Sequence, residues 1–264
     1  MSAGSAGSPA ATVSRLSVTA VKGTTLRTVQ SVELESHGAR GDRQFFVIDE
    51  RDRMVNGKML GALQTVVAEW DEDSRRLSMS FADGARVAGV VNAGPPVSAR
   101  FFSRTQEGRL VQGPWAPAMS EHFGQPLRLV EAEGSVDRGA GGAVSLISRG
   151  SLDRLAREAG DDAIDARRFR MMIEVAGLAP HAEDEWVRRR AQIGGAVVRF
   201  GGHVGRCLIT SRDPDSGEVD LPTLDLLRAY RSDTDTTEPL AFGIHGRVLE
   251  PGRIAVGDPV ALLG

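Results

Sequence analysis

The chain has 264 residues, of which 41% are hydrophobic and 25% are charged, and its formal net charge is −3. This length and apolar content suit one large domain or two small ones. The charge gives no reason to expect nucleic acid or an acidic membrane surface as a partner. The single cysteine excludes an intramolecular disulfide, a cysteine-rich zinc site and a self-contained iron–sulfur cluster. No apolar run is long enough to span a membrane. A reducing, cytoplasmic setting is therefore expected.

The first residues, 1–11, are rich in Ser, Gly, Ala and Pro and have no basic or hydrophobic segment, so we expect a flexible tail and no signal peptide. Beyond them, alternating apolar residues and Gly/Pro/Asp turns predict many short strands. A Gly/Pro-rich stretch at residues 92–96 predicts a joint between two β-rich lobes, residues 12–95 and 96–264. The predicted strands are residues 13–21, 28–35, 43–49, 63–70, 76–81, 86–91, 99–104, 127–131, 169–175, 196–200 and 206–210, with two more within 242–263.

Few helices are expected. The clearest covers residues 151–159, where apolar side chains fall on one face; Ser148 or Ser151 can cap its start and Gly160 can end it. Two shorter helices are predicted at residues 114–123 and 224–230. Many short strands and few helices favour a mainly β fold of the β-barrel type.

The only cysteine, Cys207, follows Arg206 in the chain. A neighbouring guanidinium stabilises a thiolate, which is the form that attacks electrophiles and binds soft metals. Free cysteine is also among the most buried residue types and is usually inert. The residues alone therefore leave open a metal ligand, a reactive thiol and a packed core residue.

Eight short stretches occur in one order along the chain. They are AVKG at 20–23, GDRQF at 41–45, SRGSL at 148–152, RFR at 168–170, EDEW at 183–186, GRCLIT at 205–210, DPDSG at 213–217 and PGRIAVGDPV at 251–260. Together they resemble the MOSC domain, named for the C-terminus of molybdenum cofactor sulfurase, and the β-barrel domain that often precedes it. The likeness covers residues 12–264 and implies a β-barrel MOSC fold.

The functional relatives implied by this resemblance are the mitochondrial amidoxime-reducing component and its bacterial counterparts. In them a cysteine thiolate ligates the molybdenum of a pterin cofactor, molybdopterin, and the enzyme reduces N-hydroxylated compounds. Cys207 stands at the position of that cysteine, so the resemblance makes it the expected metal ligand and catalytic residue.

The resemblance also implies residues for the rest of the site. The cofactor carries a phosphate, and the expected cofactor-binding residues are Lys22, Arg43, Lys58, Arg170, Arg206 and Thr210. His245 stands where relatives carry an aromatic hydroxyl, and it could donate protons to a leaving hydroxyl. Simpler roles stay open: a solvated surface charge for each arginine, the opposite face of the strand for Arg206, strand propensity for Thr210, and a structural histidine for His245.

Four positions depart from the family pattern. Met171 and Met172 follow the Arg-Phe-Arg motif where Pro-Asn is usual, and Gly23 and Gly205 stand where serine is usual. The loss of the asparagine and of the two serines removes three polar groups, which points to a shifted cofactor, a changed substrate or a protein without the cofactor.

Three hypotheses follow. The first is a molybdenum-cofactor oxidoreductase that removes the oxygen of an N–OH group from a small molecule. Its two electrons must come from a separate ferredoxin- or flavoprotein-type donor, because the chain has no flavin fingerprint and one cysteine cannot hold an iron–sulfur cluster. The second is a metal-free sulfur-handling protein in which Cys207 carries a persulfide or attacks a C–S electrophile, with Arg206 and His203 stabilising the thiolate. The third is a non-catalytic binding barrel with Cys207 in its core.

Overall fold

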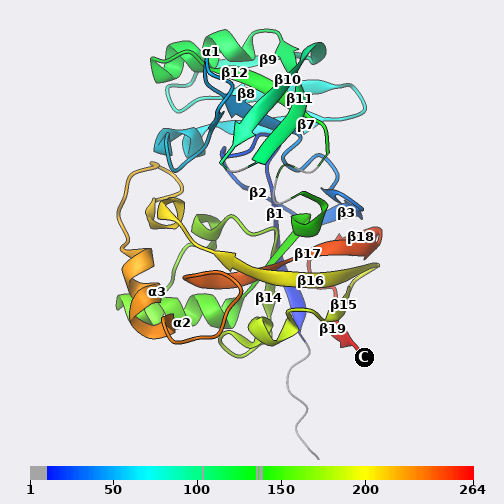
Figure 1. Ribbon diagram of the computed structural model, residues 1–264, viewed down its shortest axis with the longest axis vertical. Helices are drawn as coiled ribbons and strands as arrows, with labels where there is room; N and C mark the ends of the chain where they lie inside the picture. The colour runs from blue at the N-terminus through cyan, green and yellow to red at the C-terminus, as the bar shows by residue number, and fades with distance from the viewer. Residues whose placement is uncertain (1–10, 103, 135, 137–138) are drawn as a thin grey trace, which may run out of the picture.

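The computed structural model of the protein describes residues 11–102, 104–134, 136 and 139–264. The predicted tail, residues 1–11, lies outside these ranges except for its last residue. The fold is mainly β, as expected, and its elements form two lobes, one above the other (Figure 1).

The lower lobe is built on an eight-stranded sheet. All of its strand pairs are antiparallel except β13 with β14. The strand order is β19 (Val260–Leu263), β15 (Arg190–Ile193), β16 (Ala196–Gly205), β17 (Ala241–Glu250), β13 (Val144–Ser148), β14 (Ile173–Ala176), β1 (Thr12–Val18) and β2 (Arg27–Val29). A smaller sheet of β18 (Gly252–Ala255), β3 (Ser31–Glu35) and β4 (Gly38–Ala39) packs against it.

The prediction of a β-barrel is corrected in one respect: among the described residues, no sheet closes on itself. The gap in the large sheet is bridged at one end, where Val13 N donates to Asp258 O at 2.9 Å and Gly257 N donates to Val13 O at 2.8 Å. Pro259 lies opposite Thr12 and has no N–H to donate. Val260 N donates to Ala11 O at 2.8 Å, but β1 and β19 form no ladder.

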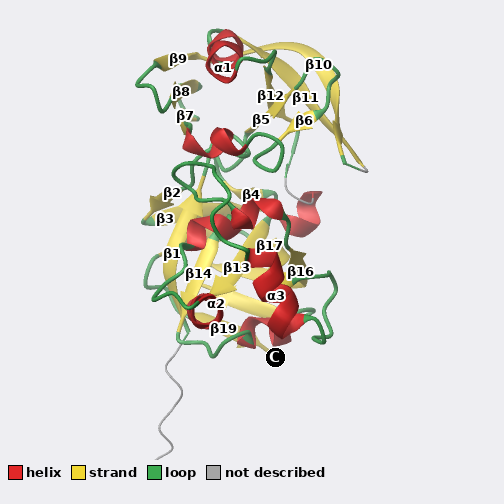
Figure 2. Cartoon of the chain, turned by 90° about the vertical axis from the view of Figure 1, so that its left-hand side faces the viewer, coloured by secondary structure: helices red, strands yellow, loops and turns green. Residues whose placement is uncertain are grey.

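Two helices lie on one face of the large sheet. The helix α2 (Arg149–Ala159) packs on β13 and β14 and beside α3 (Thr223–Arg231), as Figure 2 shows. The capping predictions for α2 are confirmed: Ser148 Oγ accepts the Ser151 N–H at 3.1 Å, and Gly160 ends the helix at φ 75°. The predicted strand at 169–175 begins only at β14, because η3 (Ala166–Phe169) comes first.

The upper lobe holds two further sheets and one helix, α1 (Trp115–Phe123), around its own apolar core. One sheet has the order β10 (Asn92–Phe101), β11 (Arg104–Gln112), β12 (Arg128–Ala132), β5 (Phe45–Ile48) and β6 (Met54–Val55). The other has the order β7 (Val67–Asp71), β8 (Arg76–Ser80) and β9 (Arg86–Val90). Short 3-10 helices complete the described chain: η1 (Gly61–Thr65), η2 (Gly139–Gly142), η4 (Ala182–Trp186) and η5 (Leu208–Ser211).

The predicted break at residues 92–96 is corrected, because these residues begin β10. The strand tolerates its two prolines since it lies at the edge of the sheet, and its register shifts between Ala93 and Pro96. The division of the chain at residues 95 and 96 stays a proposal.

A histidine with buried ring nitrogens, His181, lies against Tyr230 of α3. Both ring nitrogens of His181 are buried without a hydrogen-bond partner, and the ring lies 5.7 Å from those of Tyr230 and Phe242. Burial, together with the positive charge of Arg231, lowers the pKa of His181 to about 4. The folded protein therefore holds this histidine neutral.

This lowered pKa predicts acid sensitivity. As pH falls below 6.5, the unfolded chain protonates His181 while the folded chain resists until about pH 4. The stability contributed by the neutral ring is thus full above pH 6.5 and is lost between these two values. We expect the free energy of unfolding to fall with pH more steeply than in His181→Asn, by on the order of 2 kcal/mol over this window.

Urea unfolding at several pH values measures the difference. Asparagine suits the position because His181 has φ 62°, a left-handed conformation that asparagine tolerates. Parallel pH profiles for the two proteins would contradict the assignment.

Candidate functional site

A cavity of about 710 Å³ lies between the two lobes, and both contribute to its walls. This volume falls within the ordinary range for small-molecule and cofactor sites. Eight of its lining residues carry an amino, guanidinium, thiol or imidazole group: Lys22, Arg43, Lys58, Arg104, Arg170, Arg206, Cys207 and His245. All of the sequence-predicted site residues except Thr210 therefore line one cavity.

Cys207 is exposed to the cavity and is not a core residue. The prediction of a strand over 206–210 is corrected: β16 ends at Gly205, and Cys207 forms the N-cap of η5 with an extended backbone. Because the chain leaves the sheet before Cys207, its side chain is free of the packing that surrounds strand residues. The third hypothesis, with Cys207 in the core, loses its structural basis.

Thr210 lies beneath this turn instead of in the cavity wall. It is 1% exposed, and both its N–H and its Oγ1 donate to the carbonyl oxygen of Cys207 at 3.0 Å. Its own carbonyl accepts the hydroxyl of Thr223 at 2.8 Å, which ties the turn to α3. Thr210 therefore fixes the backbone that presents the thiol.

Arg43 and Arg170 hold the two lobes together by a reciprocal pair of hydrogen bonds. Arg43 Nη2 donates to the carbonyl of Arg170 at 2.9 Å, and Arg170 Nη2 donates to the carbonyl of Thr24 at 2.7 Å. Arg43 also pairs with Asp42, and both side chains of that ion pair are less than a tenth exposed. We call Arg43 and Arg170, with the hydrogen bonds that they donate between the lobes, the arginine clasp.

Arg206 turns most of its donors into the protein. Its Nε donates to the carbonyl of Phe242 at 2.8 Å and its Nη1 donates to that of Phe169 at 2.9 Å, with the guanidinium 5.3 Å from the Phe169 ring. These bonds hold the segment that carries Arg170. The alternative that Arg206 points to the opposite face of a strand does not apply, because β16 ends at Gly205.

The remaining predicted residues approach the cavity from three separate segments. Lys22 follows the end of β1, and its N–H donates to Phe45 O at 2.7 Å. Lys58 is exposed on a turn closed by its N–H to Asn56 Oδ1 at 2.8 Å. His245 lies on β17, and its Nδ1 is 3.1 Å from Gly141 O. A carbonyl can only accept, so this nitrogen carries the hydrogen.

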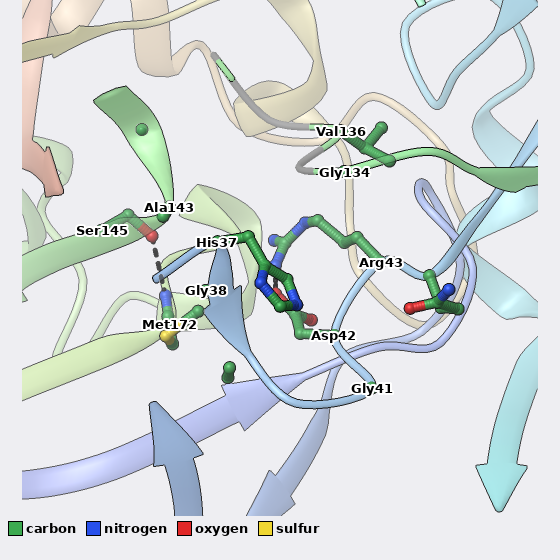
Figure 3. Close-up of a pocket in the computed structure, with 13 residues that line it drawn as sticks. His37, Gly38, Gly41, Asp42, Arg43, Gly134, Val136, Ala143, Ser145 and Met172 are labelled. Carbon is green, nitrogen blue, oxygen red and sulfur yellow. Dashed lines mark hydrogen bonds and ion pairs between the residues drawn. The ribbon is translucent and has the colours of Figure 1, made fainter. Parts of the chain in front are cut away.

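A narrower hollow of about 40 Å³, whose lining residues Figure 3 shows, adjoins the main cavity at Arg43. It is lined by His37, Asp42 and Arg43 on one side and by Ser145 and Met172 on the other, where Met172 N donates to Ser145 Oγ at 3.0 Å. Arg43, Val136, Gly142 and Ser145 line both spaces.

The departures from the family pattern have local structural reasons. Met172 is 3% exposed and belongs to the core of the large sheet, so its side chain does not line the main cavity. Met171 lines the cavity, and its sulfur lies 3.1 Å from Arg206 Nη2. Gly23 has φ 98°, and a Cβ there would come within 2.7 Å of Leu63 Cδ2. A serine at that position would have a strained backbone and would require the Leu63 side chain to shift.

The lining residues that the sequence analysis missed include Phe102, Arg104 and Glu238. Phe102 is 71% exposed beside the tip of the β10–β11 hairpin, and Glu238 lies in the loop between α3 and β17. A hairpin and a loop bring them to the cavity from points distant in sequence, so no local motif marks them.

Among the described residues, no group of three or more His, Cys, Asp or Glu side chains is placed to hold a metal ion. Within the same ranges, every helix is too short or too polar to cross a membrane.

Comparison with known families decides the assignment. The model of the MOSC domain matches residues 120–261, and that of the MOSC N-terminal beta barrel domain matches residues 10–122. The chain belongs to the MOSC domain family.

This MOSC protein resembles curated relatives over most of its length. Mitochondrial amidoxime-reducing component 1 of Mus musculus is 26% identical over 285 residues, covering 96% of this chain and 82% of the relative. Mitochondrial amidoxime reducing component 2 of Bos taurus is 28% identical over 285 residues, covering 94% and 82%. Among solved structures, the YUAD protein of Bacillus subtilis aligns with a TM-score of 0.46 at 12% identity, covering 96% of this chain and 94% of that one.

The contact between Thr210 and Cys207 predicts a measurable contribution to stability. Replacing Thr210 by Val keeps the shape of the side chain but removes the buried hydroxyl that donates to Cys207 O. We expect the free energy of unfolding in urea to fall by about 1 kcal/mol. Thr28→Val, at an exposed position on β2, is the matched control and should change it by less than about 0.5 kcal/mol. Equal effects of both substitutions would contradict the role given to Thr210.

Proposed function

We propose that this MOSC protein is a molybdenum-cofactor-dependent oxidoreductase that reduces N-hydroxylated small molecules. The observation that carries the proposal is the exposed thiol of Cys207 in a cavity walled by both lobes and lined by six lysine and arginine side chains. Relatives named for amidoxime reduction align with nearly the whole chain. An enzyme with a small-molecule substrate accounts for the exposed thiol, the basic cavity and the names of the relatives.

The residues of the cavity fit such a cofactor. A thiolate is a soft ligand and suits a metal that is already bound by sulfur. Cations suit the phosphate and carbonyl oxygens of a pterin. We propose that Cys207 is the metal ligand and that Lys22, Arg43, Lys58 and Arg170 hold the phosphate and pterin. The contacts of Arg206 and Thr210 support positioning roles. Arg206 holds the segment that carries Arg170, and Thr210 holds the backbone that carries the thiol.

When bound, the cofactor would supply a two-electron reduction of the N–O bond. The chain supplies binding, orientation and protons. His245 donates its Nδ1–H to Gly141 O, so a second proton taken up by the ring sits on Nε2. From there it can pass to the departing hydroxyl, which leaves as water.

The electrons require a separate partner. The single cysteine cannot hold an iron–sulfur cluster in this chain. We therefore include a ferredoxin- or flavoprotein-type donor in the proposal, together with a cytoplasmic setting and the expectation that neither nucleic acid nor a membrane is a partner.

A metal-free sulfur-handling protein is the second candidate. It is favoured by the exposed thiol together with the buried Met172, which offers no amide to a pterin. In that case Cys207 would carry a persulfide or attack a C–S bond.

One substitution separates these candidates. Protein produced in a host that makes molybdopterin should contain molybdenum and pterin in stoichiometric amounts, and Cys207→Ser should lose the metal and at least about 100-fold of the amidoxime reduction rate. Metal and pterin analysis with a reductant-coupled assay makes the measurement. The same protein from a host without the cofactor is the control.

Absence of metal from the wild-type protein, with a labile sulfur atom on Cys207, would instead support the sulfur-handling candidate. Full activity of Cys207→Ser would overturn both.

A further inference from the structure

We propose that Glu238 is a specificity-determining residue that selects N-hydroxylated groups of amidine type, which are cationic after reduction, over neutral ones. This inference rests on the proposed function and adds a substrate preference to it. The groups meant are amidoximes and N-hydroxyguanidines, as opposed to hydroxamic acids.

Glu238 is the one carboxylate among the described residues that line the cavity, whereas six of the others carry positive side chains. A cationic group entering this space is repelled by most of the wall, and the interaction with a carboxylate at close range is its main favourable contact. Because Glu238 is half-buried, that contact is less screened by water and salt than one on the open surface.

The carboxylate is held close to the thiol-bearing turn by its own loop. On one side of Glu238, Thr237 N donates to His203 Nδ1 at 3.1 Å, and His203 N donates to Thr237 Oγ1 at 2.8 Å. On the other side, Arg206 N donates to Leu240 O at 3.3 Å. The backbone on both sides of Glu238 is therefore tied to the segment that precedes Cys207.

Gly205 makes this placement possible. A Cβ at Gly205 would lie 3.2 Å from Glu238 Cβ, 3.3 Å from Glu238 Oε2 and 3.1 Å from the carbonyl oxygen of Pro239. These distances are shorter than ordinary contacts between such atoms, so a side chain here would push the loop outward. The departure from serine at position 205 thus coincides with a carboxylate that occupies the space above it.

The chemistry gives this placement a purpose. When an amidoxime is reduced, two electrons from the external donor and two protons enter and the N–O bond breaks. One proton joins the hydroxyl, which leaves as water, and the other joins the nitrogen, which gives the neutral amidine. The amidine formed takes up a further proton and becomes a cation at neutral pH. A carboxylate beside the reacting nitrogen stabilises this charge as it develops, whereas a hydroxamic acid yields a neutral amide and gains nothing from it.

The kinetic test compares benzamidoxime with benzhydroxamic acid, which share the ring and differ in the group reduced. We expect Glu238→Gln to lower kcat/KM for benzamidoxime about tenfold and to change that for benzhydroxamic acid less than twofold. Gly205→Ala should act in the same direction by displacing the loop. Glu250→Gln, at the exposed far end of β17, is the matched control and should change neither value. Equal losses for both substrates, or no loss for either, would overturn the proposal.

A binding measurement keeps the proposal testable if the reductase assignment fails. Calorimetric titration with benzamidine and with its neutral isostere benzamide needs neither metal nor electron donor. We expect the wild-type protein to bind benzamidine more tightly than benzamide, and Glu238→Gln to lose most of that preference. A protein that lacks molybdenum but keeps this preference refutes the proposed function alone. A molybdenum-loaded reductase whose benzamidine preference is absent, or survives in Glu238→Gln, refutes the role of Glu238 alone.

Discussion

The arginine clasp is the interaction on which the rest of the site depends. Arg43 of the upper lobe donates to the backbone of Arg170, and Arg170 of the lower lobe donates back to the backbone of Thr24. Both residues have positive φ angles, 51° and 55°, which cost free energy for any residue but glycine. This strained backbone is held in place by hydrogen bonds. The Arg170 carbonyl accepts from Arg43, and the side chains of both arginines donate to backbone carbonyls. A lysine at position 43 could not reproduce the contacts of Arg43 with both Asp42 and the Arg170 carbonyl, because it lacks the planar fork of donors.

The clasp also explains how so many positive groups share one space. Arg43 is neutralised by the buried carboxylate of Asp42, while Arg170 and Arg206 give part of their donors to backbone carbonyls. Carbonyls satisfy a guanidinium without cancelling its charge, so the cavity stays positive while its walls stay fixed. Such a wall binds anions with little rearrangement, and it makes the position of any single carboxylate important for cationic ligands.

The turn that carries the Cys207 thiol is fixed as well. Cys207 follows the end of β16, where the chain must turn, and Thr210 closes that turn with two hydrogen bonds to the same carbonyl oxygen. The loop that carries Glu238 returns to the sheet beside the same turn, at the pairing of Gly205 with Ala241. Thiol, carboxylate and guanidinium are thus ordered by one short stretch of backbone.

The sequence by itself determined the mainly β class and the helix α2 with its caps at Ser148 and Gly160. These follow from local preferences and from motifs, which are properties of neighbouring residues. The tertiary structure alone decided that Lys22, Arg43, Arg170 and Cys207 line one cavity, that Thr210 lies beneath it, and that Glu238 enters it. The open barrel and the strand through residues 92–96 were likewise settled by pairing with distant partners. Such contacts join residues far apart in the chain, and their geometry depends on the packing of both lobes, which no local pattern records.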